Sequence, residues 1–353
     1  MNLIEWHARR QLRCPLERKF EFHATAEGTF KLHVVLLPGF SQFSLSAFID
    51  PLCCANALFG RRLFEWQTVG LQAAPVASSS GMLFDVAASL ADCLCEDEAT
   101  ALVLVGGDQI EDALSPQLRA FLRRQVRSNI PIYAVGTATW LLAEAGVLRS
   151  GARCTIHWTK LAALSETFQD LIVEDVLFSQ EGNIVTCAGG FAAFDLAAEI
   201  VKECCGSDLA QRICQQLIAE GWRSGERWQS IPFGLKNTGA GAKMLQVVKL
   251  MEKNTEAPLS LDELAQRVSL SRRQLERLFE KHLSTTPHKY YMSVRLRKAR
   301  QLLENTNMPV IDVAIACGYI SSSHFSKSFK DYFQTLPSQT RAPAPVLDNR
   351  FAA

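Results

Sequence analysis

Two clusters of polar side chains in the last third of the chain have residue types that can read double-stranded DNA. The first lies in SRRQLERLFEKH, and the second follows about fifty residues later in SSSHFSKSFK. Arginine matches the paired acceptors of guanine, and glutamate accepts from the cytosine amino group. The candidate base-reading residues are Arg272, Arg273, Gln274, Glu276 and Arg277 in the first cluster and Ser322, Ser323, His324 and Lys327 in the second. Ser321, Lys281 and Lys330 are better placed to meet phosphate.

Each cluster is expected on the outward face of a helix, because apolar residues recur at helical spacing on the opposite face. The inward residues are Leu275, Leu278 and Phe279 in the first helix, and Phe325, Phe329 and Tyr332 or Phe333 in the second. A short apolar helix precedes each one, built on Leu261, Leu264, Ala265 and Val268, and on Val310, Val313, Ala314 and Cys317. Ser271 is placed to cap the first recognition helix, and Gly318 supplies the second turn. The sequence therefore predicts two helix-turn-helix units.

A long amphipathic helix is predicted between the two units, over 290–305, with Leu296, Ala299, Leu302 and Leu303 pointing inward. Such a helix can hold two recognition helices at a fixed separation. Helices about 34 Å apart enter successive major grooves on one face of DNA. One chain could thus perform the task of a dimer.

Charge is distributed unevenly along the chain. Residues 241–341 contain 16 Lys and Arg against 9 Asp and Glu, a net charge of +7, whereas the remaining 21 and 27 give −6. A positive C-terminal region suits a polyanion. The alternatives are a helical bundle with charged outer faces, or a helical protein-interaction module that would show no salt-sensitive DNA binding.

The residues SLDELAQRVSLSRRQLERLF, TPHKYYMSVRLRKARQLLE, VIDVAIACGYISSSHFSKSFK and LPSQTR together resemble the DNA-binding domain of the AraC/XylS transcription regulators. The resemblance covers about 100 residues. It implies sequence-specific binding to operator DNA and RNA polymerase as a partner. Ser284 and Gln334 stand where the family usually has glycine after each recognition helix, and Thr340 stands where it has tyrosine. We therefore expect the ends of these helices to differ from the family pattern.

The N-terminal part alternates short apolar runs with amphipathic helices. The runs LHVVLLP, FEWQTVGL, TALVLVGG and PIYAVG are expected to be buried strands, and 171–190 is expected to form a hairpin that turns near Gly182. This alternation predicts an α/β domain with a largely parallel sheet, followed by an all-α domain. The predicted boundaries are an irregular arm at 1–30, the α/β domain at 31–220, a linker at 221–240, the helix-turn-helix domain at 241–341 and a tail at 342–353.

The segments VVLLPGFSQFSLSAFIDPLCCANAL, ALVLVGG, AVGTATWLLAEAGVL, CTIHW and TCAGGFAAFDLA resemble the PfpI-like branch of the class I glutamine amidotransferase fold, a flavodoxin-like architecture. AraC-type regulators with such a domain form the GlxA-like group. The resemblance implies a domain that senses a small effector, with amino acids, betaine and carnitine as candidates, and a homodimer formed through this domain.

Catalytic relatives of this fold carry a nucleophilic cysteine at a turn between a strand and a helix. The match places Gly136 at that position, Asp50 at the acidic position and His157 at the histidine position. Glycine has no nucleophile, so the resemblance implies an inactive domain. Catalysis by a neighbouring threonine, Thr137 or Thr139, is the alternative. The rival function is a PfpI-like hydrolase or glyoxalase-type enzyme fused to a DNA-binding domain.

Ligand binding does not require a nucleophile, so the domain could bind a small molecule without catalysing a reaction. Main-chain N–H groups near Thr137 and Ala138 would favour a carboxylate, and Asp50 could hold an amine. Trp140 or Trp158 could present an aromatic face to an ammonium group. A zwitterion would use both sets of groups, whereas the competing interpretation is that the tryptophans are core residues.

Other features limit the possible functions. No apolar run reaches the roughly 18 residues of a membrane span, and no export signal is recognised at the N-terminus, so we expect a cytoplasmic protein. Most of the eleven cysteines lie in apolar runs and are expected to be reduced. Cys93 and Cys95 lack a second pair of ligands at zinc-site spacing, so neither a metal nor another cofactor is expected. The predicted protein is a transcription regulator, with activation expected over repression.

Overall fold

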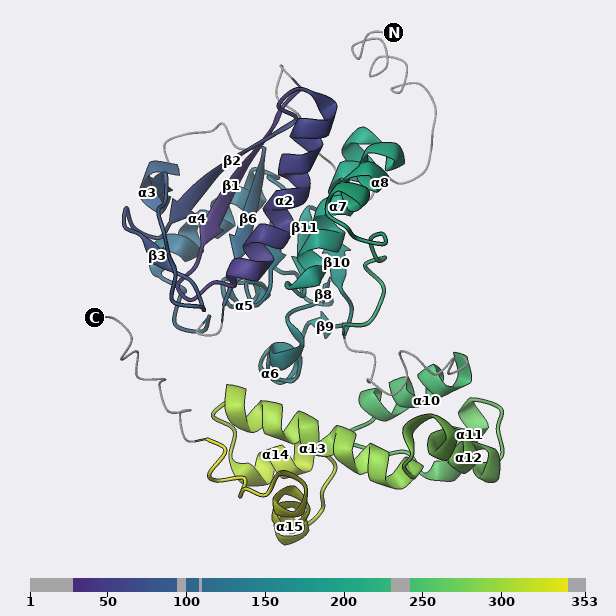
Figure 1. Ribbon diagram of the computed structural model, residues 1–353. Coiled ribbons are helices and arrows are strands. Elements are labelled where there is room, and N and C mark those ends of the chain that lie inside the picture. Colours follow the sequence, from purple (N-terminus) through teal and green to yellow (C-terminus); the bar gives the residue numbers. More distant parts are fainter. Residues whose placement is uncertain (1–27, 94–99, 108–109, 230–241, 342–353) are drawn as a thin grey trace, which may run out of the picture. The chain divides into compact units, whose positions relative to one another are not determined.

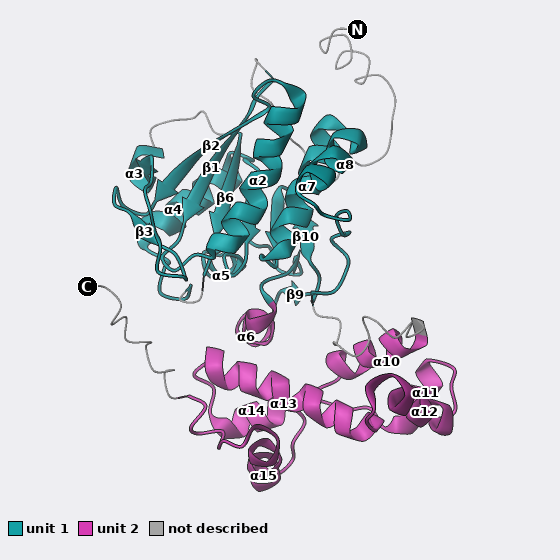
Figure 2. Ribbon diagram, viewed as in Figure 1, with its two compact units in different colours: residues 1–157, 170–229 teal, residues 158–169, 230–353 magenta. Residues whose placement is uncertain are grey.

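The computed structural model describes residues 28–93, 100–107, 110–229 and 242–341. Residues 1–27 of the predicted arm, residues 230–240 of the predicted linker, the predicted tail and Cys95 lie outside the described residues. The chain forms two compact units (Figure 2). Unit 1 contains the residues up to His157 together with Asp170–Gln229, and unit 2 contains Trp158–Gln169 together with the chain from Ser230 onward.

Unit 1 is built on a seven-stranded sheet. Its order is β10 (Phe178–Glu181), β11 (Ile184–Cys187), β7 (Ile132–Val135), β6 (Ala101–Val105), β1 (Phe30–Leu36), β2 (Phe64–Gly70) and β5 (Ala88–Ser89). Every neighbouring pair is parallel except the β10–β11 hairpin. The central strands β6 and β7 are buried along their whole length, as expected for apolar strands covered on both faces. The predicted α/β class and the hairpin are confirmed.

Three helices pack together on one face of this sheet: α2 (Gln42–Phe59), α7 (Phe191–Cys205) and α8 (Ser207–Gln216). Figure 1 shows them in front of the strands, with α4 (Pro116–Arg127) behind. Phe48 and Leu52 of α2 and Leu196 of α7 enter the main core with β1 and β6. Ser41 caps α2, because its hydroxyl accepts from the N–H of Ser44 at 3.2 Å.

Shorter elements complete unit 1. They are α3 (Leu90–Cys93), α5 (Thr139–Glu144) and the two-stranded pairs β3 (Val76–Ala77) with β4 (Leu83–Phe84), and β8 (Arg153–Cys154) with β9 (Ile172–Val173). Among the described residues, no helix has both the length and the apolar character that a bilayer span requires.

In unit 2 the helical prediction is confirmed. The helices are α10 (Ala242–Lys253), α11 (Leu261–Arg267), α12 (Arg272–Leu283), α13 (Pro287–Asn305), α14 (Val310–Ala316) and α15 (Ser322–Phe333). Leu275 and Phe279 of α12 are fully buried, as are Phe325 and Phe329 of α15. The predicted inward residues of α13 join one core with α14 and α15. The same long helix thus carries both helix-turn-helix units.

The structure divides the chain differently from the predicted boundaries at one internal segment. Trp158–Gln169 lies within the α/β sequence but belongs to unit 2. It forms a 3-10 turn (Trp158–Lys160) and α6 (Leu161–Thr167), and Ala162 enters the core of α13. Lys298 Nζ of α13 lies 3.1 Å from Glu166 Oε1. The periodicity of an amphipathic helix does not indicate which core it joins. The segment was therefore predicted to belong to the α/β domain, like the residues before and after it.

The segment Gly221–Gln229 also differs from the prediction, because it packs on unit 1 where a linker was expected. Asp195 of α7 accepts from the main-chain N–H of Arg223 at 2.7 Å, and from its guanidinium Nε and Nη2 at 2.9 and 2.6 Å. Trp222 Nε1 donates to Glu199 Oε2 at 2.7 Å. The segment Gly221–Gln229 is rich in Gly, Ser and charged residues, and this composition gives no sign of these long-range hydrogen bonds.

The ends of the recognition helices correct another expectation. Ser284 after α12 and Gln334 after α15 both adopt the left-handed conformation, with φ of 48° and 61°. Each main-chain N–H still donates to the carbonyl four residues earlier, as glycine would at a helix C-terminus. The helix ends therefore keep the usual geometry, and the non-glycine residues bear the strain.

Candidate functional site

The N-terminus of α12 is fixed by a reciprocal cap. The Ser271 hydroxyl accepts from the N–H of Gln274 at 3.3 Å, and Gln274 Oε1 accepts from the N–H of Ser271 at 2.8 Å. The side-chain carbonyl of Gln274 is therefore used within the helix cap. We predicted Gln274 among the base-reading residues, and the structure gives it this structural contact.

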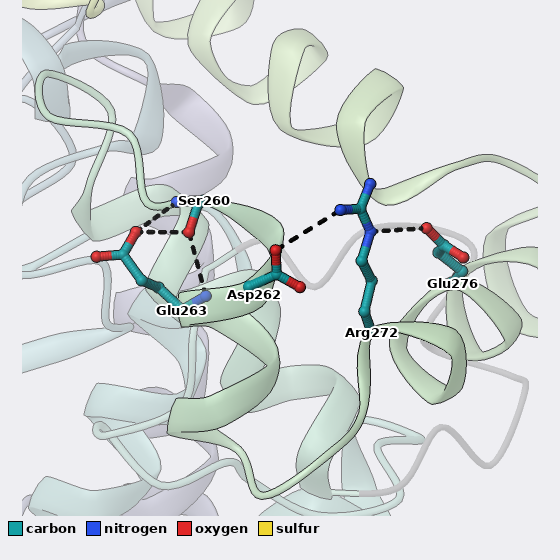
Figure 3. Close-up of polar contacts among 5 residues, drawn as sticks. All are labelled: Ser260, Asp262, Glu263, Arg272 and Glu276. Carbon is teal, nitrogen blue, oxygen red and sulfur yellow. Dashed lines mark hydrogen bonds and ion pairs between the residues drawn. The ribbon is translucent and has the colours of Figure 1, made fainter.

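Arg272 lies between two carboxylates. Figure 3 shows its guanidinium reaching Asp262 of α11 and Glu276 of the next turn of α12, at N–O distances of 3.6 and 3.2 Å. All three side chains are exposed, so the ion pairs contribute little to stability. They do preset the directions of Arg272 and Glu276. α11 has its own reciprocal cap, between Ser260 and Glu263.

Arg273 and Arg277 are one helical turn apart on α12 and are both exposed. Within the described ranges, neither takes part in an ion pair. Residues four apart share one face of a helix, so these two guanidinium groups can reach the same groove. Of the five predicted residues on α12, they are the ones most available for base contact.

On α15 the four predicted residues are all exposed: Ser322, Ser323, His324 and Lys327. Ser321 caps this helix, since its hydroxyl accepts from the N–H of His324 at 3.4 Å. Ser322 and Ser323 occupy the first turn, where recognition helices meet base edges.

The strand-to-helix turn predicted as an elbow lies in unit 1 between β7 and α5. Gly136 there has φ of 76°, a left-handed conformation that favours glycine. Its N–H donates to the Cys187 carbonyl at 2.9 Å, and its carbonyl accepts from the N–H of His157 at 3.0 Å. The main chains of Gly136 and His157 are therefore hydrogen-bonded to each other.

Close glycine packing surrounds this elbow. A Cβ on Gly189 would lie 2.8 Å from Gly136 Cα and 3.0 Å from Ser44 Oγ, and one on Gly106 would lie 2.5 Å from the nitrogen of Ala138. Ser44, near the start of α2, accepts from the N–H of Gly190 at 2.7 Å. Ser44 was not among the site residues predicted from the sequence. Its position one turn into a helix that follows a buried strand was the available signal.

The threonines near the elbow have internal partners. Thr137 Oγ1 donates to the Gly107 carbonyl at 2.5 Å, and Thr139 Oγ1 donates to the Thr155 carbonyl at 2.8 Å. Both residues are buried. A hydroxyl that donates to a fixed carbonyl has no base to take its proton, so this geometry argues against threonine as a nucleophile.

One of the predicted ligand residues, Asp50, lies away from the elbow. Asp50 is exposed on α2, six residues and roughly 9 Å of helix beyond Ser44. Trp140 is buried in α5, the helix that follows the elbow, and Trp158, which directly follows His157, is 48% exposed. The motif match assigned Asp50 by its sequence position, whereas the helical rise carries it away from the turn.

Two cysteines that could have replaced the missing nucleophile are deeply buried. Burial raises the pKa of the Cys187 thiol to about 12 and that of Cys154 to about 12. Both thiols are therefore protonated at neutral pH, and the thiolate is the reactive form.

The segment Thr155–His157 connects the elbow to both places where the chain leaves unit 1. It contacts the elbow through the Thr139 hydroxyl and the Gly136 carbonyl. Gln229, the last residue of unit 1, donates from Nε2 to Thr155 Oγ1 at 3.0 Å and to the Ile156 carbonyl at 2.8 Å. The other exit follows His157 directly and leads into α6.

Comparison with known proteins matches both units. A helix-turn-helix domain family matches residues 264–343, and the DJ-1/PfpI family matches residues 34–203. The chain is 37% identical over 312 residues to the HTH-type transcriptional regulator GbdR of Pseudomonas aeruginosa, covering 88% of this chain and 84% of that protein.

Two further regulators are similar over nearly their full length. HTH-type transcriptional regulator CdhR of Pseudomonas aeruginosa is 36% identical over 312 residues, covering 88% of this chain and 91% of CdhR. HTH-type transcriptional regulator GlxA of Rhizobium meliloti is 32% identical over 317 residues, covering 88% of this chain and 95% of GlxA. The chain therefore belongs to the AraC-family transcription regulators of the GlxA-like group, in which a DJ-1/PfpI domain precedes a DNA-binding helix-turn-helix domain.

Proposed function

We propose that this regulator activates transcription by placing α12 and α15 in successive major grooves of an operator, under the control of a small effector bound by unit 1. One observation carries the DNA-binding part. Arg273 and Arg277 are exposed and without ion pairs within the described residues, on a recognition helix fixed by its own cap. Such groups are ready to pair with guanine without first breaking internal contacts.

The operator contacts can be tested with the full-length protein and a DNA site selected from random sequence. Arg277→Ala is expected to reduce affinity by about 1 to 3 kcal/mol and to relax specificity at one base pair. Lys330→Ala, which removes an expected phosphate contact, should weaken binding to all sequences and reduce the salt slope by about 1. Unchanged affinity and specificity in Arg273→Ala and Arg277→Ala would refute the base-contact assignment.

Regulation by unit 1 is supported by the hydrogen bonds of Thr155–His157. Both exits from unit 1 are bonded or joined to this segment, and the segment is bonded to the elbow. A ligand that shifts the elbow would therefore act on the routes that lead to unit 2. It must bind two states unequally, because equal affinity shifts no equilibrium.

The proposed effector is a small zwitterion, with amino acids, betaine and carnitine-like compounds as candidates. Main-chain groups of Thr137 and Ala138 remain the proposed partners of its carboxylate. The position of Asp50 on α2 leaves the cation partner to be identified by experiment. A thermal-shift screen of the full-length protein against such metabolites tests the proposal, since selective binding raises apparent stability by mass action. An effector must also change operator affinity, and a ligand that stabilises without this effect would not be the regulator.

We further propose that unit 1 has no catalytic activity. Gly136 offers no side chain, Thr137 donates to a carbonyl, and the thiols of Cys154 and Cys187 are buried and protonated. Turnover of an amide or a 2-oxoaldehyde that is abolished by Cys187→Ser or His157→Ala would favour the rival enzyme. A homodimer through unit 1 and contact with RNA polymerase complete the proposal, and sedimentation and reconstituted transcription test them separately.

A further inference from the structure

The two helix-turn-helix units differ by one residue in their turns. Between the C-cap Val268 and the N-cap Ser271 there are two residues. Between the C-cap Cys317 and the N-cap Ser321 there are three, Gly318 to Ile320. The additional residue is an isoleucine that lies immediately before the second recognition helix.

The longer turn is fixed by contacts with α13. Arg295 of α13 donates from Nε to the Cys317 carbonyl and from Nη2 to the Gly318 carbonyl, both at 2.7 Å. Its guanidinium also lies 4.2 Å from the ring centre of Tyr319, which is buried against Phe325. Tyr319 therefore anchors the turn in the core. The next side chain along, Ile320, is directed to solvent with a relative exposure of 106%.

A single exposed isoleucine is unremarkable on most surfaces, so its position must decide its role. Ile320 precedes Ser321, Ser322 and Ser323, three exposed residues with short side chains. The N-terminal residues of a recognition helix meet base edges. In the major groove, the apolar group that base pairs present is the C5-methyl of thymine.

We propose that Ile320 is a specificity-determining residue that contacts a thymine methyl in the half-site read by α15. This inference rests on the proposed DNA contact of α15 and adds an apolar reading element to it. The two units then read DNA by different chemistry. The first relies on guanidinium groups, and the second combines serine, histidine and lysine side chains with one apolar contact at the turn.

The test uses the full-length protein, a site selected from random DNA and versions of that site in which single thymines are replaced by deoxyuridine. Deoxyuridine lacks only the C5-methyl. In the α15 half-site, one such replacement should weaken wild-type binding about fourfold, the effect of one methyl group leaving a contact. Ile320→Ala should weaken binding to the thymine site and should show no further loss with deoxyuridine there.

Controls separate this inference from the proposed function. Ile311→Ala removes another exposed isoleucine, on α14, and should keep the full deoxyuridine effect. The inference is overturned if deoxyuridine still weakens binding of Ile320→Ala fourfold, or if no deoxyuridine replacement in that half-site weakens binding of the wild type. In either case, a loss of specificity in Arg277→Ala would still support the proposed reading of the operator. Unchanged DNA affinity with reduced transcription in Ile320→Ala would overturn it in favour of a protein partner. Absence of any sequence-specific DNA binding would overturn the proposed function itself.

Discussion

The ion pair between Asp195 and Arg223 provides an asymmetric test of how Gly221–Gln229 is held on unit 1. Asp195 is 2% exposed and accepts three hydrogen bonds from Arg223, whereas the Arg223 side chain is 37% exposed. Losing one partner of a buried pair costs about 3 to 5 kcal/mol when the other charge stays buried. The two single substitutions should therefore differ strongly.

Arg223→Ala leaves the carboxylate buried with one remaining bond, from the main-chain N–H of residue 223. We expect a loss of about 3 kcal/mol, the lower end of that range. Asp195→Ala leaves a guanidinium that can turn to water and one main-chain N–H without its acceptor, which should cost about 1 to 2 kcal/mol. The double variant should be more stable than Arg223→Ala alone, because no unpaired buried charge remains.

Amide hydrogen exchange of the full-length protein measures both losses locally, on peptides from α7 and from 221–229. Arg223→Ala should increase exchange in both peptides, and Asp195→Ala mainly in 221–229. If Asp195→Ala is the more damaging variant, or if the double variant is less stable than both singles, the assigned burial of the carboxylate does not control this contact.

Four further predictions concern strain and thiols. Ser284→Gly should raise the free energy of unfolding of unit 2 by about 0.5 to 1 kcal/mol, because glycine relieves the left-handed strain but also increases the conformational entropy of the unfolded chain. A melting temperature below that of the wild type would contradict the observed φ of 48°. Gly136→Ala should destabilise unit 1 by about 1 to 3 kcal/mol, because φ is 76° and its Cβ would lie 3.3 Å from a carbonyl oxygen; urea unfolding at the wild-type midpoint would refute this. An alkylating reagent should label the exposed Cys53 and spare Cys154 and Cys187 in the native protein, as peptide mass spectrometry can show. Burial raises the pKa of both the Cys154 and Cys187 thiols from 9.0 to about 12. The free energy of unfolding should therefore be unaffected by these thiols below pH 9 and should fall above it, by about 1.4 kcal/mol per thiol at pH 10. A free energy of unfolding that does not change between pH 8 and 10.5 would contradict the burial.

Local patterns were sufficient for most of the fold. Buried strands such as Ala101–Val105, the Gly182 hairpin and the cap at Ser271 follow from alternation, turn chemistry and helical spacing. These signals are short-range, so a single sequence can display them. The outward face of α12 was predictable for the same reason.

Contacts between distant residues were not predictable in this way. Asp195 and Arg223 are 28 residues apart, and neither residue type signals its partner. The pairing of Arg272 with Asp262 across two helices was equally hidden. Asp50 was selected by motif position, which gives order along the chain but not the direction of a side chain around a helix.

The assignment of α6 to unit 2 bears on how such regulators can be recombined. Gln301 and Asn305 of α13 donate side-chain hydrogen bonds to the carbonyls of Trp158 and Thr159, and Ala162 joins the core that α13 forms with α14 and α15. A chimera joined at residue 230 would therefore pair α13 with a foreign version of this segment. Exchange of DNA-binding domains between relatives should succeed only when the α6 segment is exchanged together with α13. A functional DNA-binding domain is therefore encoded by two separate stretches of the gene.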